Sequence, residues 1–158
     1  MDKNILILGL GNILMGNEGI GVRAIEFLKD QKIAQNVRLL DGGTGGFHLL
    51  SLFQEYSKFI IIDATISDGV FGEINVLQPK FASDFPRTLT SHDIGLRDLM
   101  QSAELLGDLP EIHLLTINIK DLNEVGIGIS DALEQCLPKI YHTIQGILAN
   151  MQASTLKP

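Results

Sequence analysis

The stretch ILILG at residues 5–9 decides the fold. It is a continuous aliphatic run that stops at a glycine, a pattern typical of a strand buried on both faces of a parallel sheet. Residues 19–28 follow with apolar side chains at helical spacing, and Val22, Ile25 and Leu28 share one face. A buried strand followed by an amphipathic helix is the repeating unit of α/β proteins.

The same alternation continues to the end of the chain. Further strands are predicted at residues 37–40, 59–62, 73–77 and 112–119, and further helices at 47–53, 93–106 and from Ser130 onward. The strand at 73–77 follows its predecessor too closely for a helical crossover, so we expect it to run antiparallel. Pro138 should kink or split the last helix. The pattern predicts a three-layer α/β/α sandwich, one domain over residues 1–158 with a frayed tail at 153–158.

Composition narrows the classes of partner. The 158 residues carry a formal net charge of −7, which repels nucleic acid and anionic membranes. Cys136 is the only cysteine, so an internal disulfide framework and a cysteine-rich zinc site are excluded. No apolar run reaches the roughly 18 residues of a membrane span, and the first residues do not form a signal peptide. We therefore expect a cytoplasmic protein that binds neither nucleic acid nor membrane.

Acidic residues and one histidine follow predicted strands at the edge where α/β proteins carry their sites. Glu18 comes after the first strand, Asp63 after the third, and His92 precedes a helix. Two carboxylates and one imidazole leave coordination positions open for water or substrate, as in catalytic metal sites. Each residue also has a purely structural alternative: Glu18 near a helix start, Asp63 in a turn, and His92 at the surface.

The glycines after the first strand also permit a dinucleotide-binding hypothesis. Gly9 and Gly11 match the first two glycines of that fingerprint, and Asp41 could hold a ribose. Leu14, however, occupies the third glycine position, and the carboxylate of Glu18 would repel a pyrophosphate. For His48, His113 and His142 we expect structural roles, and for Cys136 a place in the core.

Four motifs together resemble the nickel–iron hydrogenase maturation endopeptidases. They are GLGNIL with EGIGV (residues 9–14 and 18–22), DGGT (41–44), IIDA (61–64) and SHDIGL (91–96), and they occur in the family's order. The resemblance extends from residue 4 to about residue 148. It implies a mixed, mostly parallel five-stranded sheet with helices on both faces, and it places the family's metal-binding triad at Glu18, Asp63 and His92.

The resemblance also implies an activity. Enzymes of this family remove a C-terminal extension from the immature hydrogenase large subunit after nickel has been inserted. The divalent metal is expected to be nickel presented by the substrate, with zinc or cadmium as substitutes, and Glu18, Asp63 and His92 are the expected catalytic residues. We assign the loop that holds Asp41, Gly42, Gly43 and Thr44 to substrate contact, because glycines let a peptide backbone approach closely.

One position departs from the family pattern, and one question stays open. Family members commonly carry an acidic residue just before Glu18, where this chain has Asn17. The metal could polarise the scissile carbonyl and activate water, or it could serve only to place the peptide bond. A binding module that docks the same precursor without cutting it is the leading non-enzymatic alternative.

Overall fold

The structure, a computed structural model, describes residues 4–86, 96–120 and 128–156. Its strands are β1 (Ile5–Gly9), β2 (Val37–Asp41), β3 (Lys58–Thr65), β4 (Ile74–Leu77) and β5 (Glu111–Asn118). Its α-helices are α1 (Ile20–Lys29), α2 (Leu52–Glu55), α3 (Leu96–Leu106), α4 (Asp131–Glu134) and α5 (Leu137–Leu156). Three short 3-10 helices complete the description: η1 (Gly16–Gly19), η2 (Phe47–Leu49) and η3 (Ala82–Asp84).

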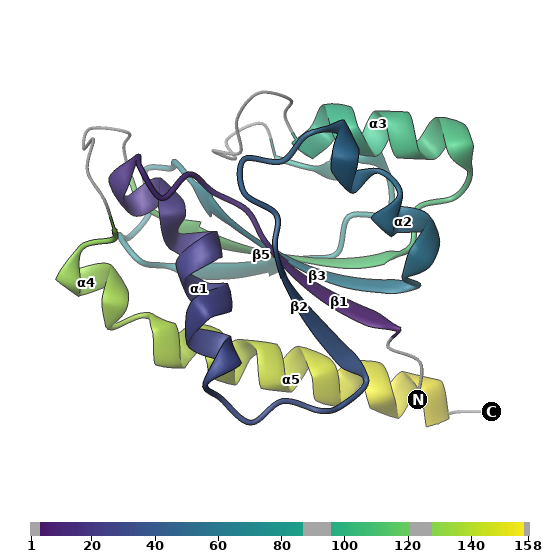
Figure 1. The fold of residues 1–158 in the computed structure, drawn as a ribbon. Coiled ribbons are helices and arrows are strands. Elements are labelled where there is room, and N and C mark those ends of the chain that lie inside the picture. Colours follow the sequence, from purple (N-terminus) through teal and green to yellow (C-terminus); the bar gives the residue numbers. More distant parts are fainter. Residues whose placement is uncertain (1–3, 87–95, 121–127, 157–158) are drawn as a thin grey trace.

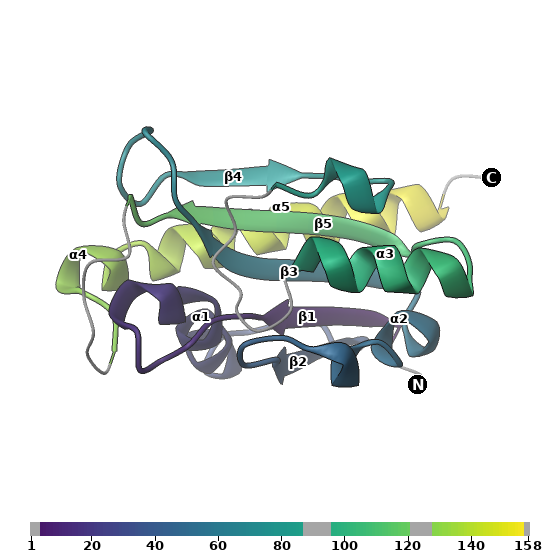
Figure 2. The same cartoon turned by 90° about the horizontal axis from the view of Figure 1, so that it is seen from above.

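The five strands form one sheet in the order β2-β1-β3-β5-β4 (Figures 1 and 2). β2, β1, β3 and β5 are parallel, and β4 pairs antiparallel with β5. The short connection between β3 and β4 leaves no room for a crossover helix, which is why β4 reverses direction. The mixed, mostly parallel five-stranded sheet and the α/β sandwich are thus confirmed.

The strands separate two hydrophobic cores because successive side chains point to opposite faces. In β1, Ile5 and Ile7 enter the core beneath α1 and α5, whereas Leu6 and Leu8 enter the core beneath α2 and α3. Both faces of β1 are buried, so its unbroken aliphatic run is what a central parallel strand requires.

The end of β3 differs from the sequence prediction. β3 continues through Asp63 to Thr65, because the long register with β5 pairs Asp63 with Thr116. The expected split of the last helix is confirmed: it forms α4 and α5, and Pro138 lies in the first turn of α5, where its missing N–H costs nothing. α5 extends to Leu156, into the segment for which fraying is expected.

Candidate functional site

Glu18 lies in η1, the short helix between β1 and α1, and its side chain is only 1% exposed. The chain can turn tightly here because Gly11 has φ +149°, and a Cβ on Gly11 would lie 2.2 Å from the carbonyl oxygen of Glu18. The backbone at Glu18 therefore packs directly against Gly11, in the loop that follows β1. Glycine at position 11 is a requirement of this approach.

Asp63 lies inside β3 and is fully buried. It shares a face of the strand with Phe59 and Ile61, which belong to the core under α2 and α3. Its Oδ1 accepts a hydrogen bond of 2.8 Å from the backbone N–H of Ala64. The structural alternative for Asp63, a place in a turn after its strand, is wrong because β3 extends past it.

Glu18 and Asp63 are held at the same edge of the sheet. η1 packs against β3. Leu10 N donates to Ile62 O at 2.9 Å, and a Cβ on Gly21 would lie 2.5 Å from that same carbonyl oxygen. The start of α1 thus abuts the residue that precedes Asp63. His92 lies outside the described residues, and those residues hold no cluster of three or more potential metal ligands.

The predicted substrate loop forms a tight turn next to β1. Gly42 N donates to Gly9 O, Gly11 N donates to Gly43 O, and Asp41 Oδ1 accepts from Gly43 N at 2.8 Å. Gly43 has φ +57°, and a Cβ placed on it would meet nothing within 4 Å. Within the described residues, open space therefore lies in front of its backbone. Thr44 is half-buried in the same turn.

The same geometry argues against a dinucleotide site. The space that a pyrophosphate would need beside Gly11 is filled by the backbone of Glu18. The carboxylate of Asp41 is engaged by Gly43 N, and Leu14 is exposed rather than packed between helix and strand. These glycines bring segments of the chain together and do not form a phosphate cradle.

The structure adds exposed apolar side chains at this edge, which the sequence analysis did not single out. Ile13 is 45% exposed, Leu14 57% and Phe47 55%. Ile13 and Leu14 precede η1, and Phe47 follows the glycine turn. The sequence gives one signal for them: large apolar residues occur in connecting segments, where burial in a core does not require them.

His113 and His142 lie elsewhere, whereas His48 directly follows Phe47. His113 is buried in β5 with Nε2 3.5 Å from Glu111 Oε2. The ring of His142 in α5 is tilted by 45° to that of Tyr141, with the centroids 5.8 Å apart. His48 lies in η2. Cys136 is free and half-buried, and it packs at the border of the core under α1 and α5.

Comparisons with known proteins give consistent matches to one family. A family model described as hydrogenase maturation protease matches residues 22–147. The hydrogenase 2 maturation protease of Escherichia coli (strain K12) is 31% identical over 153 residues, which cover 95% of this chain and 92% of that protein. The hydrogenase expression/formation protein HupD of Rhizobium leguminosarum bv. viciae is 32% identical over 150 residues, 91% of this chain and 73% of its own length.

A solved structure gives the same result. The hydrogenase maturating endopeptidase HybD from E. coli superimposes with a TM-score of 0.79 at 30% identity, over 98% of this chain and 94% of that one. The fold and these comparisons place the chain in the class of α/β maturation proteases. The chain belongs to the hydrogenase maturation protease family. Within the described residues, no helix has the length and apolar content needed to span a bilayer.

Proposed function

We propose that this protein removes the C-terminal extension of the precursor of a nickel–iron hydrogenase large subunit after nickel insertion. Glu18, Asp63 and His92 bind the nickel that the precursor carries, and the substrate loop holds the peptide. The observation that carries the proposal is the burial of two carboxylates, Glu18 and Asp63, at one edge of the sheet. Membership in the maturation protease family supports the reaction class.

Burial of two carboxylates makes chemical sense beside a cation. Moving one carboxylate out of water costs several kcal/mol even after the protein relaxes. A divalent ion at this edge offsets that cost, and carboxylate oxygens with one imidazole suit nickel, zinc or cadmium. α3, which begins shortly after His92, covers the face of β3 that Asp63 shares. The donor set therefore fits a divalent ion.

The surroundings of the two carboxylates support a macromolecular substrate. The open space at Gly43 admits a peptide backbone, and Ile13, Leu14 and Phe47 expose apolar surface nearby in the chain. Exposed apolar side chains beside polar ones are typical of a protein-docking surface. Bound nickel polarises the adjacent carbonyl group or fixes the position of the peptide bond. Glu18 and Asp63 orient that ion from two different elements, η1 and β3.

The place of action that we propose is the cytoplasm. The single cysteine, Cys136, is free, as expected in a reducing compartment. Fractionation of cells that express the chain, followed by immunodetection, tests this assignment.

Mixing the protein with two forms of precursor, nickel-loaded and nickel-free, tests the reaction. We expect mass spectrometry to show loss of a C-terminal peptide from the nickel-loaded form only. Cleavage of both forms would show that nickel is not required. A stable complex without any mass change would favour the binding module.

A further inference from the structure

The short helix η1, which carries Glu18, is weakly stabilised by its own hydrogen bonds. η1 has no side-chain cap, and Glu18 N donates to Met15 O at a long 3.3 Å. Gly16 in this helix has φ +59°. A helix of one turn supplies too few hydrogen bonds to fix a side chain, so contacts from elsewhere must hold it.

η1 packs against β3 and Gly11, and a further set of contacts comes from a distant part of the chain. The side-chain Oδ1 of Asn17 accepts a hydrogen bond of 2.8 Å from the backbone N–H of Ser130. Successive residues of a 3-10 helix point about 120° apart. Asn17 can therefore reach sideways to Ser130 while Glu18, the next residue, is directed into the protein.

Two further contacts flank this hydrogen bond. Gly128 N donates to Ile13 O at 3.3 Å on one side. Arg23 makes a two-point ion pair with Glu134 on the other, with N–O distances of 2.9 and 3.2 Å. We call these three contacts the η1–α4 seam; Figures 1 and 2 both show α4 beside the start of α1. Asn17 is the middle contact and the one nearest to Glu18.

The geometry points to Asn17 as a positioning residue that fixes Glu18 by joining η1 to the residue that caps α4. Ser130 is held by its backbone, because its carbonyl oxygen accepts from Leu133 N at 3.1 Å and from Glu134 N at 2.9 Å. η1 is thereby held against a fixed point. The inference rests on the proposed function, since it assigns Asn17 a role through the nickel-binding carboxylate of Glu18.

The role of Asn17 as a hydrogen-bond acceptor predicts the effect of an acidic residue at position 17. An aspartate there keeps an oxygen that can accept from Ser130 N, so it preserves the contact. Alanine removes the acceptor, so the partly buried backbone N–H of Ser130 loses this hydrogen bond. Asn17→Asp should therefore act as the conservative variant, and Asn17→Ala as the disruptive one.

Ser130→Ala provides the matched control. It deletes the Oγ that caps α4 but keeps the backbone N–H that Asn17 accepts. A cap loss of this kind should lower the melting temperature by about 2–4 °C without moving Glu18. It separates loss of stability from loss of positioning.

The test combines three measurements on wild type, Asn17→Ala, Asn17→Asp and Ser130→Ala. They are amide hydrogen exchange at Glu18 and Ser130 by NMR, calorimetric titration of the isolated protein with cadmium, and the rate of precursor processing. For Asn17→Ala we expect faster exchange at both amides and a loss of about 10–100-fold in cadmium affinity and processing rate. Asn17→Asp should stay within about threefold of wild type or bind cadmium more tightly, and Ser130→Ala should change only the melting temperature.

The outcomes separate this inference from the proposed function. Wild-type exchange at Glu18 and wild-type processing by Asn17→Ala would overturn the positioning role, even if Glu18→Gln is inactive. Equal losses in Asn17→Ala and Ser130→Ala would also overturn it, because a general stability effect would explain both. Normal processing by Glu18→Gln would instead remove Glu18 from the reaction, while the exchange data would still report whether Asn17 holds η1.

Discussion

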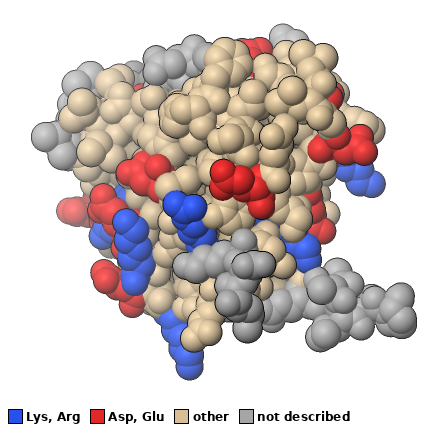
Figure 3. All heavy atoms as spheres, turned by 45° about the vertical axis from the view of Figure 1, so that its right-hand side comes forward, with Lys and Arg blue, Asp and Glu red and all other residues tan. Residues whose placement is uncertain are grey.

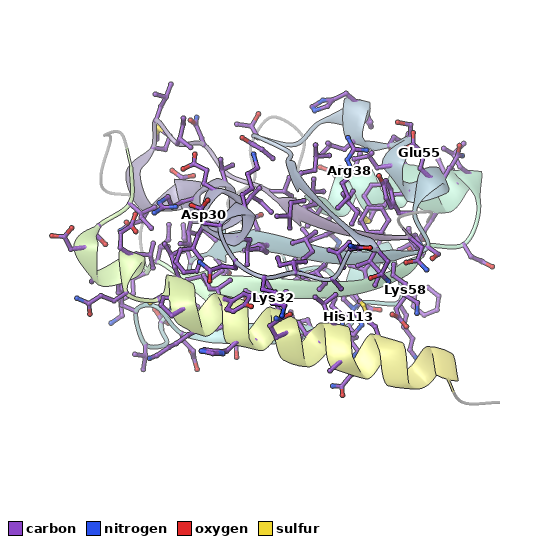
Figure 4. All side chains as sticks on the ribbon, turned by 60° about the horizontal axis from the view of Figure 1, so that its bottom comes forward. Asp30, Lys32, Arg38, Glu55, Lys58 and His113 are labelled. Atoms are coloured by element: carbon purple, nitrogen blue, oxygen red, sulfur yellow. The ribbon has the colours of Figure 1, made fainter. Side chains whose placement is uncertain are left out.

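Charged side chains are buried at one end of the strands, the carboxyl edge, and exposed at the other, the amino edge. At the carboxyl edge, Glu18 and Asp63 are buried. At the amino edge, half-buried Lys58 and exposed Glu111 are paired at the start of β3 and β5. Figure 3 shows acidic and basic side chains interspersed across the middle of the face that it draws. Figure 4 shows Lys58 and His113 toward this second end, where His113 lies beside the half-exposed Glu111.

The amino edge shows how charges are accommodated when only stability matters. Arg38 donates to the hydroxyl of Tyr56 at 2.9 Å, and this hydrogen bond raises the pKa of the arginine. Such groups stay solvated and contribute little individually. The buried carboxylates of the carboxyl edge carry a larger desolvation cost than these solvated groups. We therefore expect substitutions at the two edges to have unequal consequences.

The largest difference should come from neutralising a buried carboxylate. We expect Asp63→Asn to lower precursor processing by about 100-fold or more, because the amide does not bind a cation as a carboxylate does. The amide oxygen can still accept from Ala64 N, so the melting temperature of the isolated protein should not fall. The matched variant at the amino edge, Glu111→Gln, should process normally.

The processing rate by quantitative mass spectrometry and a thermal melt decide this comparison. Full activity of a well-folded Asp63→Asn protein would show that the carboxylate serves no cation. Equal losses in Asp63→Asn and Glu111→Gln would erase the distinction between the edges.

A pair of glycines with the same backbone angle sharpens the comparison. Gly11 and Gly107 both have φ +149°, but a Cβ on Gly107 meets nothing within 4 Å, whereas one on Gly11 meets Glu18 O. Gly107→Ala should cost about 1–3 kcal/mol of unfolding free energy through backbone strain alone. Gly11→Ala should cost about 1–3 kcal/mol more and reduce processing, because Glu18 must move.

Urea denaturation measures both free energies. Equal costs for the two alanine variants, with processing intact in Gly11→Ala, would show that the close approach at Glu18 O does not constrain the site.

The smallest predicted effect concerns exposed leucines. Leu14, 57% exposed near η1, should contact the precursor, whereas Leu105, 87% exposed in α3, should not. We expect Leu14→Ser to raise KM about 5–10-fold with kcat nearly unchanged, in keeping with the loss of one apolar contact of about 1 kcal/mol. Leu105→Ser should leave both constants unchanged, and a larger KM for Leu105→Ser than for Leu14→Ser would reverse the assignment of the docking edge.

The sequence predicts the layers well because hydrophobic periodicity is a local signal. The buried strand at residues 5–9 and the helix that follows it can be recognised from their own side chains. The antiparallel direction of β4 follows from the length of a loop. Ser130 is recognisable as a cap from its residue type, and its Oγ does accept from Leu133 N.

The site is predicted less completely because its geometry depends on long-range pairing. Asp63 has a low strand propensity, so local preference ends β3 before it, whereas eight paired positions with β5 carry the strand through it. The partner of Asn17 cannot be predicted from neighbouring residues either, since Ser130 is 113 positions away along the chain. The sequence identifies Glu18 and Asp63 as candidates, but not that both are buried.

The position of β1 within the sheet also has a kinetic consequence. β1 comes first along the chain, yet it lies between β2 and β3, and its two faces belong to different cores. It cannot be covered until β3 and the helices of both layers have been synthesised. Parallel pairings of this kind close long loops and form slowly. Until they form, the apolar segment of residues 5–10 stays open to aggregation.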